Sequence, residues 1–151
     1  MKVRQATLLD LLLITPLAEL YVKEAKQHDQ YTFDLQTSLH NASSTIMSED
    51  GCFLVAIDKG LVVGFLWGHA ANLPWSRKIL AFDTILYVRP DKRKHSSAGY
   101  KLMKHWEQWA KERGAEEVQI SIASGIHEED TLKFYKKLGY HYIGTQLRKE
   151  C

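Results

Sequence analysis

The chain has 151 residues, a length that favours one domain and suffices for a sizeable buried core. Hydrophobic residues make up 45% of it and charged residues 25%, which are ordinary values for a soluble globular domain. The formal net charge of +2 excludes a polycationic chain, so binding of nucleic acid would require a local basic patch.

The N-terminal sequence MKVRQATLLDLLLITP has an acidic residue inside its apolar run and no small-residue cleavage site, so it lacks the features of a secretory signal. No apolar stretch approaches the roughly 20 residues that a membrane span requires. Cys52 and Cys151 form no CxxC pair, and we interpret them as a buried strand thiol and a tail residue. We therefore expect a reducing, cytoplasmic location.

The first third of the chain predicts a strand followed by two helices. Alternation in KVRQAT favours a short strand over Lys2 to Thr7. Thr7 can cap a helix, with Asp10 three residues on as its capping-box partner. The helix continues through LLLITPLAELYVKEA, where Pro16 either kinks or restarts it. A loop at His28 to Tyr31 precedes a second helix over Leu35 to Met47.

The apolar period then changes to that of strands. CFLVAID and LVVGFLWGHA, joined by Lys59-Gly60, predict a β-hairpin. The segment NLPWSR interrupts the pattern, and KILAFDTILYV predicts a third long strand that ends at Val88.

The last third predicts a helix, a strand, a helix and a strand. A helix from about Ala98 to Arg113 places Leu102, Trp106 and Trp109 on one apolar face, and Gly114 is suited to end it. EEVQISIA is a predicted strand, EEDTLKFYKKL a helix that ends at Gly139, and YHYIGTQLR a final strand. This order predicts one α+β domain over residues 1–151, with a mixed, mostly antiparallel central sheet and helices on both faces.

The segment VRPDKRKHSSAGYKL, residues 88–102, combines cations with small side chains at the start of a helix. Helix N-termini offer unpaired N–H groups and a partial positive charge, so a turn with little side-chain bulk binds phosphate well. Ser96 to Gly99 have little bulk, and Lys92 to Lys94 add charge. The segment is therefore either a phosphate-binding turn or a solvated basic loop that begins a helix.

This segment resembles motif A of the GNAT superfamily of acetyl-CoA-dependent N-acetyltransferases. YVRP, Tyr87 to Pro90, matches the end of the family's fourth strand, and Lys94, Ser97 and Gly99 stand at the positions of its loop pattern (Gln/Arg)-x-x-Gly-x-(Gly/Ala). Lys94 replaces Gln or Arg, and Ser97 replaces the first Gly. A register through Arg93, Ser96 and Ala98 fits about as well.

The resemblance extends to both ends of the chain. VRQATLLD is similar to the family's opening strand and helix, and DTLKFYKKLGYHYIGTQLRKE to its closing segment, with Glu128 where an Asn is frequent. It implies the GNAT acyl-CoA N-acyltransferase fold, with pantetheine between the splayed fourth and fifth strands and the pyrophosphate on backbone N–H groups. The implied acetyl-CoA contacts are Tyr87, Val88, Lys94, His95, Ser96, Ser97, Ala98, Gly99 and Tyr100.

The implied reaction is direct attack of a neutral amine on the acetyl thioester, polarised by a backbone N–H near Val88. Tyr135 matches the family's acid, because a phenol with a pKa of ~10 can protonate a thiolate whose conjugate thiol has a pKa of ~8.5; otherwise it is a core aromatic. Asp83, on an otherwise apolar strand, is either the base or a solvent-facing residue. Glu128, Glu129 and Asp130 either attract a cationic acceptor or complement the helix dipole.

The sequence therefore predicts an N-acetyltransferase that uses acetyl-CoA as co-substrate, a small-molecule or peptide amine as acceptor, and no metal. It lacks HExxH, metal-ligand histidine spacing and a GxSxG elbow. One alternative is a catalytically silent GNAT-fold module that binds acyl-CoA or a protein. Another, a nucleic-acid module at Lys92 to Lys94, lacks interleaved aromatic residues, so we expect neither nucleic-acid nor membrane partners. The resemblance makes a homodimer plausible.

Overall fold

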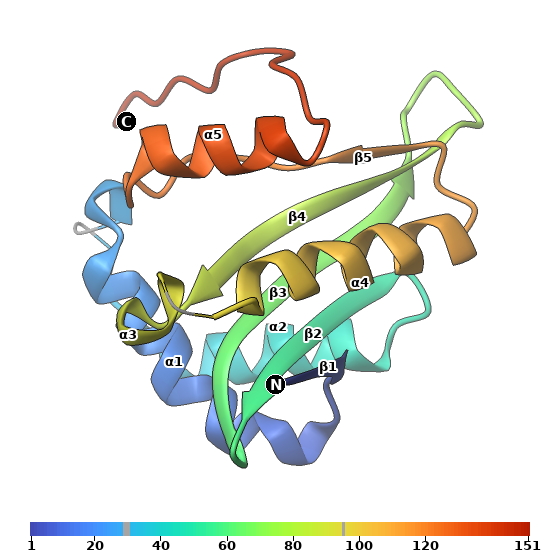
Figure 1. The fold of residues 1–151 in the computed structure, drawn as a ribbon. Coiled ribbons are helices and arrows are strands. Elements are labelled where there is room, and N and C mark those ends of the chain that lie inside the picture. The colour runs from blue at the N-terminus through green and yellow to red at the C-terminus, as the bar shows by residue number, and fades with distance from the viewer. Residues whose placement is uncertain (29–30, 95) are drawn as a thin grey trace.

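The computed structural model describes residues 1–28, 31–94 and 96–151 (Figure 1). Its sheet has the order β1-β2-β3-β4-β5, antiparallel from β1 to β4 and parallel between β4 and β5. The strands are β1 (Lys2–Gln5), β2 (Gly51–Asp58), β3 (Leu61–Asn72), β4 (Ile79–Val88) and β5 (Glu117–Gln119). The helices are α1 (Leu11–Glu24), α2 (Leu35–Met47), α3 (Pro90–Arg93), α4 (Ala98–Glu112) and α5 (Glu128–Lys137), with 3-10 turns η1 (Leu8–Asp10) and η2 (Lys26–His28). The predicted α+β fold is confirmed.

Helices cover both faces of the sheet, as predicted. In Figure 1 α4 lies in front of the strands and α2 behind them. The rear core joins Phe53 and Phe65 to apolar residues of α1 and α2. The front core joins Leu54 and Leu66 to α4, where Trp106 is fully buried. Alternate residues of β2 and β3 thus point to opposite cores, as the period of two requires.

The local signals for the hairpin and the first helix are confirmed. Lys59 and Gly60 both have positive φ, 50° and 80°, as the tight turn between β2 and β3 requires. Asp10 accepts hydrogen bonds from the Thr7 backbone N–H at 2.7 Å and from Arg4 Nη1 at 2.6 Å. Helix α1 continues through Pro16, and α2 has the predicted bounds.

The predicted last strand, YHYIGTQLR, is wrong. The structure assigns no strand after β5 in the described residues, and residues 141–150 are exposed. The physical reason is that no strand edge among the described residues pairs with this segment, so its apolar residues Tyr142 and Ile143 stay exposed. The strand EEVQISIA is also shorter than predicted, since only Glu117–Gln119 pair. The short helix α3 was not predicted.

Within the described residues, no helix is long and apolar enough to cross a membrane.

Candidate active site

The two parallel strands β4 and β5 pair over three residues and then diverge. Leu80, Ala81 and Phe82 lie opposite Glu117 to Gln119, and the next residues do not pair. At this fork the Asp83 carboxylate accepts the Ser121 backbone N–H at 2.8 Å. The register of β4 against β3 slips by one residue at Thr84, because Trp67 lies opposite Ile85 whereas Gly68 lies opposite Asp83. A bulge therefore redirects β4 at the point where β5 leaves it.

Beyond the fork, one edge of β4 pairs with no strand that the structure describes, and we call it the open edge. The Arg89 N–H donates to Val63 O at 2.9 Å and therefore points toward β3. The Val88 carbonyl accepts Arg93 Nε at 2.8 Å and thus points the other way. Because strand residues alternate, the backbone polar groups of Leu86 share the direction of Val88. This edge can pair with an extended chain that carries amide groups, as a strand would.

Asp83 is half-buried, and burial raises its pKa to about 6 despite the hydrogen bond from Ser121. At neutral pH the carboxylate is therefore ionised and more basic than an ordinary aspartate. A base with a pKa near the working pH is suited to proton abstraction.

Tyr135 of α5 is 4% exposed and close enough to Asp83 for their charges to interact. Burial raises the pKa of Tyr135, and the Asp83 carboxylate raises it further. Its hydroxyl has no hydrogen-bond partner among the described residues. The phenol is thus protonated at neutral pH and available as a donor.

The turn before α4 presents backbone N–H groups that lack a partner within the part of the chain that the structure describes. The first intrahelical bond runs from the Lys101 N–H to Ser97 O at 2.9 Å, and among the described residues the N–H groups of Gly99 and Tyr100 have no partner. Ala98 is buried, whereas Ser96 is half-buried and Ser97 exposed. A Cβ at Gly99 would meet only the Phe134 ring, at 3.8 Å. The predicted contact at His95 lies outside the described residues.

Three of the four cations around this turn are neutralised within the chain. Lys92 pairs with Asp58 at 3.0 Å, Arg89 with Asp91 at 3.1 Å, and Arg93 with Glu24. Exposed Lys94 has no ion-pair partner among the described residues. The basic run therefore presents far less free charge than its sequence indicates.

Tyr87, a predicted cofactor contact, points its side chain into the rear core. It is 2% exposed, its ring packs on Tyr21, and its hydroxyl donates to Glu24 at 2.6 Å. Contact with a cofactor through Tyr87 remains a prediction, whereas Val88 lies on the open edge.

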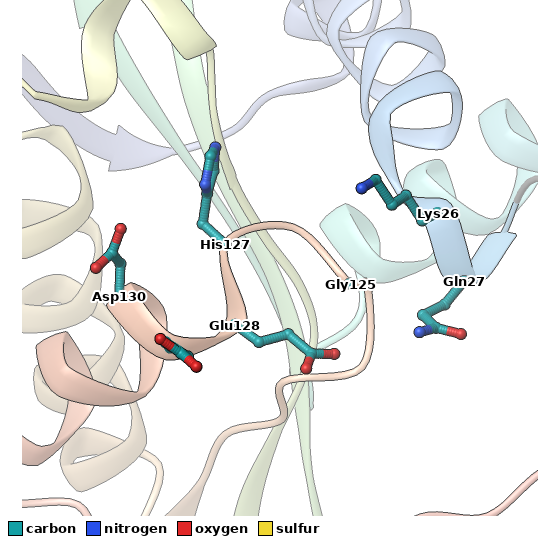
Figure 2. A pocket seen from close by; sticks show the side chains of 7 residues that line it. Lys26, Gln27, Gly125, His127, Glu128 and Asp130 are labelled. Carbon is teal, nitrogen blue, oxygen red and sulfur yellow. The ribbon is translucent and has the colours of Figure 1, made fainter.

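A pocket of about 440 Å³ lies between η2 and the start of α5. Figure 2 shows Lys26 and Gln27 on one side and His127, Glu128 and Asp130 on the other, with Glu128 directed toward Gly125. Acidic residues dominate its α5 side, and they also stand where a helix dipole favours them. Nowhere in the described ranges do three or more His, Cys, Asp or Glu side chains gather as a metal site.

Glu24 and Ser121 are site residues that the sequence did not predict. Glu24 accepts a hydrogen bond from Arg93, which is 69 residues away in the sequence. The Ser121 N–H donates to Asp83, which is 38 residues away. Their contacts depend on tertiary structure, and the sequence carried no local signal for either.

The model of the GNAT acetyltransferase domain family matches residues 49–142. These residues include β2 to α5, and with them the fork, the open edge and the turn before α4. No curated protein matches the chain.

Many solved structures share the fold. An aminoglycoside acetyltransferase from an uncultured soil metagenomic sample is 17% identical, with a TM-score of 0.77 over 99% of this chain and 97% of its own. AAC(6')-Iy, solved with the bisubstrate analogue CoA-S-monomethyl-acetylneamine, is 15% identical, with a TM-score of 0.78 over 99% and 98%. A ribosomal-protein-alanine N-acetyltransferase from Brucella melitensis biovar Abortus 2308 is 17% identical, with a TM-score of 0.73 over 100% of each chain. At these identities the likeness concerns the fold.

Proposed function

Since the chain belongs to the GNAT acetyltransferase family, we propose that it transfers an acetyl group from acetyl-CoA to a primary amine by direct attack. The observation that carries this proposal is the fork, where a basic carboxylate and a protonated phenol lie beside an open strand edge. In this proposal the 151 residues form one GNAT domain that works in the cytoplasm.

The residues present fit acetyl-CoA. The pantetheine amides would pair with the open edge at Leu86, and the Val88 N–H would polarise the thioester carbonyl. The pyrophosphate would bind the N–H groups of Gly99 and Tyr100, which have no partner in the described ranges, with Lys94 as the available cation. Ser96, Ser97 and Ala98 leave room for this approach because their side chains are small.

The chemical step uses Asp83 and Tyr135 in opposite roles. Asp83 takes a proton from the acceptor ammonium, directly or through a water, and the neutral amine attacks the carbonyl carbon. The new C–N bond forms as the C–S bond breaks. The nitrogen loses its second proton as the amide forms. Because the pKa of Tyr135 is raised above that of a free phenol, its main contribution is a hydrogen bond to the developing thiolate, and the proton it passes to the sulfur is replaced by the one that the nitrogen releases.

A cationic small molecule or a peptide N-terminus is the expected acceptor. Glu128, Glu129 and Asp130 beside the pocket at the α5 start give that side a negative charge. Structural neighbours are described as acting on aminoglycosides and on a ribosomal-protein alanine, which makes both classes worth testing. Binding of nucleic acid is disfavoured, because internal ion pairs occupy Arg89, Lys92 and Arg93.

The test is release of free CoA thiol from acetyl-CoA with a panel of aminoglycosides, polyamines and peptides, checked by mass spectrometry of the acetylated product. We expect thiol release that depends on the acceptor. Binding of acetyl-CoA without turnover on any amine would instead favour a silent acyl-CoA-binding module. A homodimer, which the family resemblance suggests, is measured independently by light scattering.

A further inference from the structure

Four residues, Glu24 to Gln27, lie beyond the fork where β4 and β5 diverge, and they contact both sides of it. On the β4 side, Arg93 Nη2 donates to Glu24 Oε2 at 2.8 Å and Nη1 donates to Oε1. On the β5 side, the Gln27 N–H donates to Ser124 O at 3.2 Å. In Figure 1 the end of α1 meets the connection between β5 and α5 at this place.

On the β4 side, Glu24 contacts two groups, the Tyr87 hydroxyl and the Arg93 guanidinium. Its carboxylate accepts the Tyr87 hydroxyl at 2.6 Å as well as both Arg93 donors. Arg93 in turn donates its Nε to the Val88 carbonyl at 2.8 Å and lies 5.1 Å from the centre of the Tyr87 ring. Glu24 therefore fixes the last residue of the open edge through Arg93. With side chains 25% and 22% exposed, this pair is better shielded from solvent than an ordinary surface ion pair.

The β5 side is held by close packing. Gly125 has a φ of +76°, and a Cβ there would lie 3.2 Å from Gln27 Cγ. Ala25, between the two anchors, is fully buried. Arg148 adds a hydrogen bond to Gln27 O at 2.5 Å. A displacement of Glu24 would therefore be transmitted to Ser124 through a short, packed segment.

We propose that Glu24 and Arg93 are positioning residues, which hold Glu24–Gln27 as a brace that sets the separation of the two sides of the fork beyond the point where β4 and β5 diverge. Asp83 and Ser121 fix that separation at the fork. This inference rests on the proposed function, because the thioester would lie between these two fixed points. A looser brace widens the range of thioester positions relative to Asp83 and Tyr135. Turnover then falls while the pyrophosphate site at α4 is unaffected.

The test compares Glu24→Gln with Asp50→Asn. Both remove a carboxylate that accepts two Arg donors, since Arg113 Nε and Nη2 both donate to Asp50 Oδ1. Arg113 ends α4, on the side of the molecule away from α3 (Figure 1). For Glu24→Gln we expect hydrogen–deuterium exchange at amides 120–126 to rise at least about fivefold, kcat to fall about tenfold or more, and the KM for acetyl-CoA to stay within about threefold. Asp50→Asn leaves all three at wild-type values.

Arg93→Lys is the second variant, and it keeps the charge but loses the paired donors and the Val88 bond. It should reproduce the changes in exchange and kcat. Unchanged hydrogen–deuterium exchange at amides 120–126 in folded Glu24→Gln or Arg93→Lys would refute the proposed brace. An equal rise of this exchange in Asp50→Asn would refute it as well. Exchange is measured without an acceptor, so a wild type that acetylates no amine refutes the proposed function alone. If neither variant folds, the pair is a determinant of folding and the positioning role is refuted.

Discussion

Replacing Asp83 with asparagine removes the negative charge at the fork and keeps the shape of the side chain. The amide oxygen can still accept the Ser121 N–H, which Asp83 accepts at 2.8 Å. The substitution therefore separates the effect of the charge from that of the hydrogen bond. If Asp83 is a buried base retained for chemistry, the variant should be more stable and less active than the wild type.

The magnitude follows from the pKa of Asp83, which burial raises from 3.8 to about 6. At about 1.4 kcal/mol for each pKa unit, ionisation of the carboxylate destabilises the folded state by about 3 kcal/mol. Solvent reaches part of this half-buried group, so we expect Asp83→Asn to raise the unfolding free energy by about 1 to 2 kcal/mol at pH 7.5.

The pH dependence has a definite sign. Because the folded pKa of Asp83 exceeds the unfolded one, the contribution of its protonated form to stability is complete below about pH 4 and is lost as the pH rises through 6. The stability difference between variant and wild type should thus vanish near pH 4 and reach its full size above pH 7. Urea unfolding at both pH values, followed by tryptophan fluorescence, measures it.

Activity should change in the opposite direction. Wild-type kcat/KM should rise with pH through about 6 as Asp83 ionises, whereas Asp83→Asn should lose this limb and about 10²-fold or more in kcat. A variant with wild-type turnover would show that Asp83 is not the base. A variant less stable than the wild type at pH 7.5 would contradict the inferred cost of burying the charge.

Three further predictions concern single residues. Tyr135→Phe should lower turnover about 10²-fold and leave the affinity for acetyl-CoA unchanged. Stability should also be unchanged, since the hydroxyl has no partner among the described residues. Activity equal to that of the wild type would exclude the acid role. Gly99→Val should fold, because its Cβ region is open, but should lose stabilisation by acetyl-CoA; normal binding would contradict the assigned turn. Asp10→Asn should lower the free energy of unfolding by about 1 to 2 kcal/mol at pH 7, because Arg4 lowers the pKa of Asp10 to about 2. This loss should become smaller as the pH falls from 4 toward 2. A loss that does not depend on pH in urea unfolding would refute the role of the ion pair.

Local signals predicted most of the elements. The Lys59-Gly60 turn, the Thr7–Asp10 cap and the apolar face around Trp106 depend on neighbours in sequence, and the structure confirms each. The final strand failed because a strand requires an edge to pair with, which its own sequence does not describe. Tyr142 and Ile143 are residue types that favour strands, but their side chains are exposed to solvent.

The candidate site was predicted in part. The small residues before α4 and the acid within β4 were visible in the sequence, because bulk and charge are properties of single residues. The basic run was misleading, since Lys92 and Arg93 have carboxylate partners on β2 and α1. Long-range ion pairs of this kind leave no periodic pattern, so charge counted along the chain overestimates the charge available to a ligand.

The most direct test of the central claim, that the fork and the α4 turn form an acetyl-CoA site, is the melting temperature with and without acetyl-CoA. At a hundredfold excess over the dissociation constant, binding to the folded state adds about 2.7 kcal/mol, which for a chain of this length raises Tm by about 5 to 10 °C. Short duplex DNA at physiological salt should leave Tm unchanged. A Tm unaffected by saturating acetyl-CoA, or raised equally by DNA, would contradict the claim.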